Sequence, residues 1–291
     1  MRTGMVAGPA WLAGWTGQNL RHAAALIRQG ANPAARVYES IGSDFFLAVA
    51  PGWLNLGLWD GPGTEAEAGQ ACRRLVTTLA SQLPAEAVLA DVGNGLGTQD
   101  PLIAEVARPR RLLAVNITQW QLAAGRERLR QAAAAPVAAD AVRLPFADGS
   151  LDGIISVEAA FHFRSRTAFF AECYRVLRPG GVLSMSDISM QRWPVSPAEL
   201  LSGLTQLRVF GLRPAMAMTS GQIGAAARAA GLTGVEVTAC GDRVIAPAVR
   251  LTAQRLDGPT AAPAGQQALA RLLLPQVALL WRRGIIEYLL V

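Results

Sequence analysis

A glycine-rich turn between an apolar run and a helix is the feature that most constrains the fold of this 291-residue chain. Residues 88–98 read VLADVGNGLGT, so a short apolar strand ends at Asp91 and three glycines alternate behind it: Gly93, Gly95 and Gly97. Glycine adopts left-handed backbone angles without steric cost and lets bare backbone approach a ligand. The helix behind the turn offers unpaired N–H groups and a partial positive charge. The stretch predicts a nucleotide-type ligand, although such a turn also occurs without one.

Alternating strand and helix signals extend this pattern to a whole domain. Predicted strands lie at 88–90, 112–115, 137–139, 153–157, 182–186, 235–239 and 285–291. Predicted helices lie at 64–83, 101–108, 118–133, 166–177, 197–210, 221–230, 244–256 and 266–281. Alternation of this kind is typical of a doubly wound parallel sheet. The sequence therefore predicts an α/β fold with a mainly parallel, seven-stranded sheet, N-terminal helices and a helical cap insertion.

Breaks in the pattern divide the chain into four predicted parts: an N-terminal helical and aromatic lid segment (1–63), a cofactor-binding core (64–190), a helical cap insertion (191–234), and last strands and C-terminal helices that complete the core (235–291). The aromatic loop from Trp53 to Trp59 either walls an acceptor pocket opposite the Pro197–Ala230 helices or packs as a hydrophobic loop.

Composition narrows the classes of partner. All 27 basic residues are arginine, and they are scattered rather than gathered into a stripe with interleaved aromatics, so no nucleic-acid partner is predicted. Three distant cysteines without a Cys-x-x-Cys pattern predict neither a disulfide framework nor a metal site, and reduced thiols favour the cytoplasm. No signal peptide or integral membrane segment is predicted. The sequence leaves homo-oligomer formation open.

Five polar residues stand at the carboxyl ends of the predicted strands: Asp91, Asn116, Asp140, Glu158 and Asp187. A single one would be typical of an ordinary loop. Ligands of parallel sheets bind at the carboxyl ends of the strands, near the point where the strand order reverses. Five such residues at consecutive strand ends therefore favour a ligand site.

Longer motifs around these residues resemble the class I S-adenosylmethionine-dependent methyltransferases over about residues 66–187. They are DVGNGLG, VNIT followed by Gln119 and Gln121, AADAVRLPFADGSLD, VEAAFHF and FFAECYRVLRPGGVLSMSDIS. The blocks LPF-x-DGS-x-D and RVLRPGG are far more specific than the glycine turn. Within the class, the sequence is similar to the bacterial small-molecule group that contains rebeccamycin- and erythromycin-type sugar O-methyltransferases. Sterol and tocopherol C-methyltransferases are relatives.

The resemblance implies S-adenosylmethionine as the cofactor, with S-adenosylhomocysteine as its product. The residues implied to bind it are Asp91, Gly93, Asn94, Gly95, Asn116, Ile117, Gln121, Asp140, Ala141 and Glu158. Two of them depart from the pattern. Asn94 replaces a small residue or a cysteine, and Asn116 stands where many relatives place an acid for the ribose hydroxyls. An amide still forms hydrogen bonds there, although weaker ones than a carboxylate.

The resemblance also implies that His162 and Asp187 act together as a base, with Glu158 lining the cleft. Imidazole titrates near neutrality, and a carboxylate can orient it and balance its charge. The alternative is that His162 is a packed residue between Phe161 and Phe163. The other histidine, His22, is interpreted as structural.

The function implied is methyl transfer to a hydroxyl of a small, largely apolar natural product or glycoside. The alternative is C-methylation of an isoprenoid or another electron-rich alkene, with Glu158 or His162 removing the proton. More remote alternatives are a nicotinamide-dependent oxidoreductase, which favours an acid at position 116, and a ligand-binding protein without catalysis.

Overall fold

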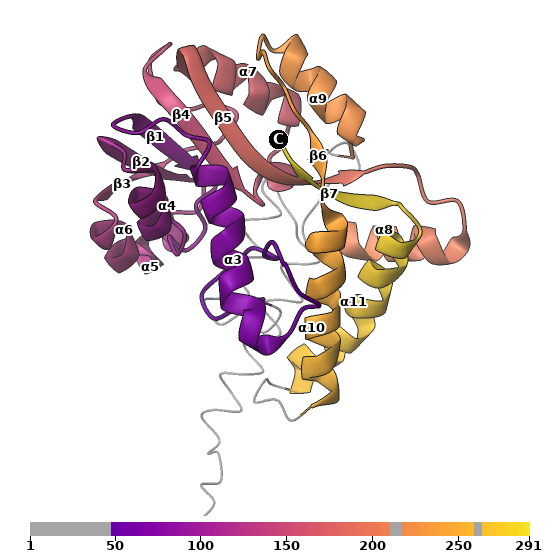
Figure 1. Cartoon of the computed structure of the whole chain (residues 1–291). Helices are drawn as coiled ribbons and strands as arrows, with labels where there is room; N and C mark the ends of the chain where they lie inside the picture. The colour runs from indigo at the N-terminus through magenta and orange to yellow at the C-terminus, as the bar shows by residue number, and fades with distance from the viewer. Residues whose placement is uncertain (1–47, 210–216, 259–263) are drawn as a thin grey trace, which may run out of the picture.

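A seven-stranded sheet forms the centre of the molecule (Figure 1). The structure is a computed structural model, and it describes residues 48–209, 217–258 and 264–291. The predictions for residues 1–47, including the N-terminal helices and His22, lie outside the described residues. The strands are β1 (Val88–Val92), β2 (Arg111–Asn116), β3 (Ala134–Ala138), β4 (Leu151–Val157), β5 (Leu177–Met190), β6 (Thr238–Ala239) and β7 (Ile286–Leu290).

The strand order is β3-β2-β1-β4-β5-β7-β6. The strands from β3 to β5 are parallel, whereas β7 runs antiparallel between β5 and β6. From β1 the chain proceeds outward to β3 and then returns to place β4 on the other side of β1, so the order reverses between β1 and β4. The predicted doubly wound, mainly parallel seven-stranded sheet is confirmed, and the reversal fixes where a ligand site is expected.

Helices cover both faces of the sheet (Figure 1). They are α3 (Glu65–Ala80), α4 (Asp100–Ala107), α5 (Gln119–Ala124), α6 (Arg126–Gln131), α7 (Arg166–Val176), α8 (Pro197–Val209), α9 (Ser220–Ala229), α10 (Ile245–Asp257) and α11 (Ala264–Arg282), with short 3-10 turns at η1 (Ala160–His162) and η3 (Gly241–Arg243). One apolar core joins α3, α4 and α10 to the sheet, and a second joins α7 and α9 to the opposite face. Residues on both faces are therefore apolar along the strands, as in other parallel sheets.

Several boundaries differ from the prediction for identifiable reasons. The third strand begins at Ala134 rather than 137 and includes Pro136, which an edge strand tolerates because one side forms no ladder bonds. The predicted helix over 118–133 is broken at Gly125, where a side chain would come 2.5 Å from the Leu96 carbonyl oxygen. The fifth strand is longer than predicted, and the sixth shrinks to Thr238–Ala239.

Candidate active site

The glycine turn lies at the reversal of strand order, wedged between the ends of β2 and β4. Gly93 has a φ of +84°, and its amide donates to the Val115 carbonyl at 2.8 Å. A Cβ atom at Gly93 would come within 2.4 Å of the Ala159 Cβ, just beyond β4. Only glycine satisfies both the backbone angle and this close approach, so the turn is fixed against the carboxyl end of β4.

Two buried carboxyls lie beside the turn. Asp91, at the end of β1, accepts two hydrogen bonds from Gln99 Nε2 at 2.9 and 2.7 Å. Asp100, at the start of α4, accepts from Asn94 Nδ2 at 3.2 Å, while its Oδ1 has no hydrogen-bond partner among the described residues. Burial, together with the neighbouring Asp100, raises the pKa of Asp91 well above its usual range, and burial raises the pKa of Asp100 to about 7. The turn therefore has acceptors suited to a cationic group.

Asn116 belongs to the hydrogen-bond network that surrounds the glycine turn. Its Nδ2 lies within hydrogen-bond distance of Gln121 Oε1 (3.0 Å) and Asn94 Oδ1 (3.3 Å), and its Oδ1 accepts from the Thr118 amide at 2.8 Å. The amide of Asn116 thus bonds to other protein groups in a way that a carboxylate could not, because a carboxylate donates nothing. Ile117, next in the chain, exposes half of its surface and offers an apolar face.

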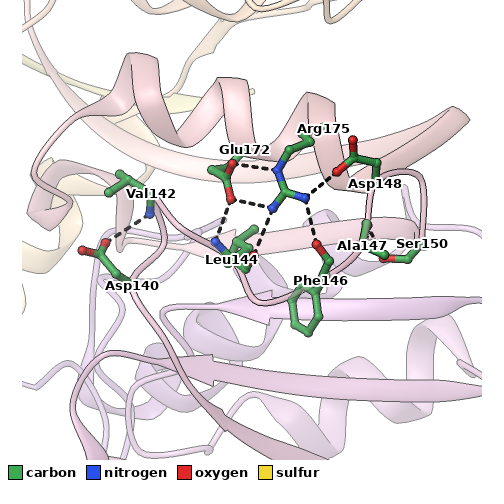
Figure 2. A network of polar contacts seen from close by, with 9 residues as sticks. All are labelled: Asp140, Val142, Leu144, Phe146, Ala147, Asp148, Ser150, Glu172 and Arg175. Carbon is green, nitrogen blue, oxygen red and sulfur yellow. Dashed lines mark hydrogen bonds and ion pairs between the residues drawn. The ribbon is translucent and has the colours of Figure 1, made fainter.

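The loop after β3 carries Asp140 and Ala141. Asp140 is partly exposed, pairs with Arg164 at 3.3 Å and accepts from the Val142 amide at 3.1 Å, whereas Ala141 is buried. The next residues of this loop are held by α7, as Figure 2 shows.

The polar contacts of Arg175 and Glu172 on α7 explain part of the most specific sequence motif. Arg175 donates to Glu172, to Asp148 and to the carbonyl oxygens of Leu144 and Phe146, while the Leu144 amide donates to Glu172 at 2.7 Å (Figure 2). The blocks LPF-x-DGS and RVLRPGG are therefore coupled in space. Their contacts hold the loop that positions Asp140.

Glu158 follows β4 and combines several unusual features. Its φ is +49°, a left-handed backbone angle that is strained for a residue with a side chain and is typical of functional sites. Oε1 accepts from the Leu56 amide at 2.7 Å and from the Tyr288 hydroxyl at 2.8 Å. Burial raises the pKa of Glu158 to about 7, against the opposing effect of these two donors. Burial therefore moves the titration of this carboxyl from the acidic range toward neutral pH.

Asp187, the predicted orienter of His162, is held by Arg166. Asp187 is fully buried and forms a bidentate ion pair with Arg166, through contacts of 2.6 and 3.1 Å. Its carboxylate also accepts from the amide of Ile188. Arg166 and a backbone amide thus supply the donors that hold this carboxylate, and the joint action of His162 and Asp187 as a base stays a prediction.

The surroundings of His162 disfavour its charged form. The ring lies 4.3 Å from the Phe161 ring, centroid to centroid. Burial and the positive charge of Arg166 lower the pKa of His162 to about 3. The imidazole is thus neutral in the physiological range and only a weak proton acceptor.

The aromatic loop reaches the site through other residues than its tryptophans. Trp59 is fully buried and packs with α3 and α10, and Trp53 is half-buried against the same core. Leu54 instead approaches Gly95, where a Cβ atom would lie 3.1 Å from its Cδ1. Together with the Leu56 amide on Glu158, this contact places the loop over the glycine turn. The burial of Trp59 favours the second interpretation of this loop, a packed hydrophobic segment.

Three important residues were missed by sequence reasoning: Asp100, Arg166 and Tyr288. Each reads locally as an ordinary first-turn or strand residue, whereas Arg175 was included only as the first residue of the RVLRPGG block. The acid-rich spacing of Asp91 and Asp100 around the glycines was the only signal that could have exposed one of them.

The remaining surface features lie elsewhere. A groove of about 1200 Å³ at the opposite end of β5 is lined by residues such as Arg178, Gly180 and Glu236 and by none of the predicted site residues. Among the described residues, no group of three His, Cys, Asp or Glu side chains could hold a metal ion. No helix in the described ranges is long and apolar enough to cross a membrane. Cys72, Cys173 and Cys240 are buried free thiols.

Residues 90–185 match the family described as "Methyltransferase domain". One curated relative, the erythromycin 3''-O-methyltransferase of Saccharopolyspora erythraea, is 33% identical over 161 residues, which cover 53% of this chain and 52% of the relative. The chain spans about half the length of the curated relatives it matches first.

Solved structures agree with the fold. The putative sarcosine dimethylglycine methyltransferase of Galdieria sulphuraria superposes with a TM-score of 0.71 at 21% identity, over 84% of this chain and 95% of that one. The geranyl diphosphate C-methyltransferase of Streptomyces coelicolor superposes with a TM-score of 0.62 at 15% identity, over 77% and 78%.

Proposed function

We propose, from the methyltransferase domain over residues 90–185, that this protein transfers a methyl group from S-adenosylmethionine to a hydroxyl of a small, largely apolar acceptor, with Glu158 as the proton acceptor. The resemblance of the core to class I small-molecule methyltransferases supports the reaction class. The observation that carries the proposal further is the Glu158 carboxyl, with a pKa near 7, at the reversal of strand order.

The residues present fit this cofactor. Asp91 and Asp100 supply carboxyl oxygens beside the glycine turn, and the unpartnered Asp100 Oδ1 suits a cationic amine. The exposed face of Ile117 and the carboxylate of Asp140 suit an adenine ring and its exocyclic amine. When bound, the cofactor supplies an electrophilic methyl group on a positively charged sulfur. No acid at position 116 is needed for this arrangement, since Asn116 Oδ1 accepts from the Thr118 amide and can accept a second hydrogen bond from a ribose hydroxyl.

Glu158 is better suited than His162 to accept the acceptor's proton. A general base works best with a pKa near the working pH, which describes Glu158 and not the imidazole. As the hydroxyl oxygen gained the methyl group and the bond from that methyl to sulfur broke, the O–H bond would break and its proton would pass to the Glu158 carboxylate, with S-adenosylhomocysteine as the other product. The donors from Leu56 and Tyr288 hold that carboxylate in place. In this proposal Asp187 acts indirectly, by holding the guanidinium of Arg166 in place.

C-methylation of an alkene is the alternative. The same carboxylate would then remove a proton from carbon after methyl transfer. The relatives carry both reactions in their names, since one is an erythromycin 3''-O-methyltransferase and another a geranyl diphosphate C-methyltransferase. Both reactions would use the Glu158 carboxylate as the base. They differ in whether the atom that receives the methyl group is oxygen or carbon.

Two measurements test the proposal. S-adenosylhomocysteine should raise the melting temperature by mass action, whereas NAD should not. Gly95→Val should abolish the shift, because a branched side chain would meet Leu54 and occupy a left-handed position. Incubation with labelled cofactor and a panel of apolar alcohols and isoprenoids, followed by mass spectrometry, identifies the acceptor atom. Stabilisation by NAD alone, or no methylated product from any acceptor class, would contradict the proposal.

A further inference from the structure

Tyr288 connects the last strand of the sheet to the carboxyl group that we propose as the base. It lies on β7, is fully buried, and belongs to the apolar core that joins α3, α4 and α10 to the sheet. Its hydroxyl donates to Glu158 Oε1 at 2.8 Å. Because the ring is held by close packing, this hydrogen bond is formed at a set position rather than by a mobile side chain.

Ser186 sets the direction of that hydrogen bond. Ser186 pairs with Leu290 across β5 and β7, so it is a diagonal neighbour of Tyr288 on the same face of the sheet. Its Oγ accepts from the Glu158 amide at 3.0 Å, which leaves the Ser186 proton for the Tyr288 hydroxyl. The hydroxyl groups therefore donate in one direction, from Ser186 to Tyr288 and from Tyr288 to Glu158.

The groups that face Glu158 are all neutral near pH 7. Burial and the charge of Glu158 raise the pKa of Tyr288 well above its usual value, so Tyr288 keeps its proton and remains a donor. Two thiols also face this carboxyl, Cys72 on α3 and Cys240 just before η3. Burial raises the pKa of both thiols, that of Cys240 to about 12. The ionisation of Glu158 is therefore governed by burial and by its hydrogen-bond donors.

The two carboxyl oxygens of Glu158 are placed differently. Both donors, the Leu56 amide and the Tyr288 hydroxyl, bond to Oε1, at 2.7 and 2.8 Å. Within the part of the chain that the structure describes, no group donates to Oε2. An oxygen that already accepts two hydrogen bonds binds a proton less readily than its partner oxygen, because each donor stabilises the ionised form. Oε2 is therefore the better proton acceptor.

We propose that Tyr288 is a positioning residue for the proposed methyl transfer: it holds Oε1 of Glu158 and leaves Oε2 to take the acceptor's proton. The inference rests on the proposed function, since it takes Glu158 as the base. Tyr288 also stabilises the ionised carboxylate, so Glu158 acts as a base at a lower pH than burial alone would allow.

Tyr288→Phe tests the inference, because it removes the hydroxyl and keeps the buried ring. Loss of one hydrogen bond to a charged group should raise the pKa of Glu158 by about one unit. Carbon-13 NMR titration of the glutamate carboxyls measures this shift without turnover, with the Glu158 signal assigned from its absence in Glu158→Gln. Tyr174→Phe, which removes an exposed hydroxyl from α7, is the matched control and should leave the titration of Glu158 unchanged.

The reaction rate should follow the same shift. In Tyr288→Phe the rise of kcat/KM should move up by about one pH unit, so that the loss is about tenfold at pH 6 and largely recovers at high pH. A merely structural role would lower the rate equally at every pH. 3-Fluorotyrosine in place of Tyr288 is a more acidic and stronger donor, so it should move the titration and the rate profile to lower pH.

The outcomes separate this inference from the proposed function. An unchanged or lowered pKa of Glu158 in Tyr288→Phe would overturn the inference, whatever the rate. If Tyr288→Phe does not fold, the 3-fluorotyrosine chain decides, and a Glu158 titration equal to that of the unmodified chain overturns the inference. A raised Glu158 pKa with an unmoved rate profile would support the contact between Tyr288 and Glu158 and would contradict the proposed function, because Glu158 would then not be the base.

Discussion

Two regions of this molecule bury carboxyl groups, with opposite consequences. At the carboxyl end of the sheet, Asp100 and Glu158 accept only from neutral donors, and burial raises the pKa of each to about 7. On helix α8, Glu199 meets the guanidinium of Arg192, and the pKa of Glu199 falls to about 2. A buried acid without a cation holds a proton that can be exchanged near neutral pH, whereas a buried acid with a cation is a fixed structural charge. The first arrangement suits the proposed proton transfer, and the second fixes a helix.

The largest expected effect is at Glu158. Glu158→Gln keeps the shape and the hydrogen bonds to Leu56 and Tyr288 but removes the base. Turnover should fall by about 10²–10⁴-fold, the usual contribution of general base catalysis. His162→Asn is the matched control and should stay within about tenfold of the unmodified rate, as expected when the loss of a base is not involved. Steady-state kinetics, with the methylated product identified by mass spectrometry, measures the turnover of both variants. A larger loss of turnover in His162→Asn than in Glu158→Gln would identify His162 as the base.

The largest expected effect on stability, as opposed to turnover, is at the ion pair between Arg166 and Asp187. Arg166→Met leaves the buried Asp187 carboxylate without its counter-ion and should lower the free energy of unfolding by about 3–5 kcal/mol. The double variant Arg166→Met/Asp187→Leu removes both charges and should recover much of the loss. Urea titration followed by circular dichroism measures each. No loss in the single variant would show that Asp187 is protonated in the fold.

The pH dependence sharpens the contrast. Since the pKa of Glu158 is raised to about 7, kcat/KM should rise about tenfold per pH unit below 7 and level off above it. His162, with a pKa near 3, predicts a flat profile over the same range. Stability runs the other way, because the fold favours protonated Glu158. Its contribution is complete below about pH 4.5 and is lost as pH rises through 7, with a size on the order of 3 kcal/mol. Glu158→Gln should remove this difference in urea titrations at pH 5 and 8.

Removing the buried charge of Glu199 on α8 is expected to lower the stability of the fold to a smaller extent. Glu199→Gln weakens the bonds to Arg192 and to the Val195 amide and should lower the melting temperature, by less than Arg166→Met does. The loss should be complete above about pH 4.5 and should shrink as pH falls through about 2, because the contribution of the ionised Glu199 to stability disappears there in the unmodified chain. Thermal unfolding at neutral pH checks the size, and a cost near zero would mean that α8 is not held by this acid.

The smallest effect is expected on the exposed face of the same helix. Leu204→Glu should change the free energy of unfolding by no more than about 0.5 kcal/mol, as exposed substitutions usually do. Chemical denaturation of Leu204→Glu beside Glu199→Gln compares the two faces of α8 directly. A larger loss at Leu204 would reverse the assignment of its faces.

The sequence was sufficient for what depends on local pattern. The glycine turn, the strand alternation and the polar strand ends predicted the sheet and most of the residues at its carboxyl end. Pairings between distant side chains were not predictable in this way. Arg166 reads as a first-turn helix residue, so nothing in its neighbourhood indicates that it neutralises Asp187. The leucines of α8 likewise predict a helix without saying which of its faces is buried, because the answer depends on α11.

The hydrogen bonds to Glu158 have a further consequence for folding. Its donors come from residues 102 and 130 positions away, so each contact closes a long stretch of chain. Contacts of that separation form late and together, because the entropy of closing the chain must be overcome first. A partly folded molecule that lacks either contact would leave this carboxyl in water, with the acidity of an ordinary glutamate. Site-specific NMR titration of Glu158 would thus report whether the whole tertiary structure has assembled, and catalytic competence would appear only in the last cooperative step.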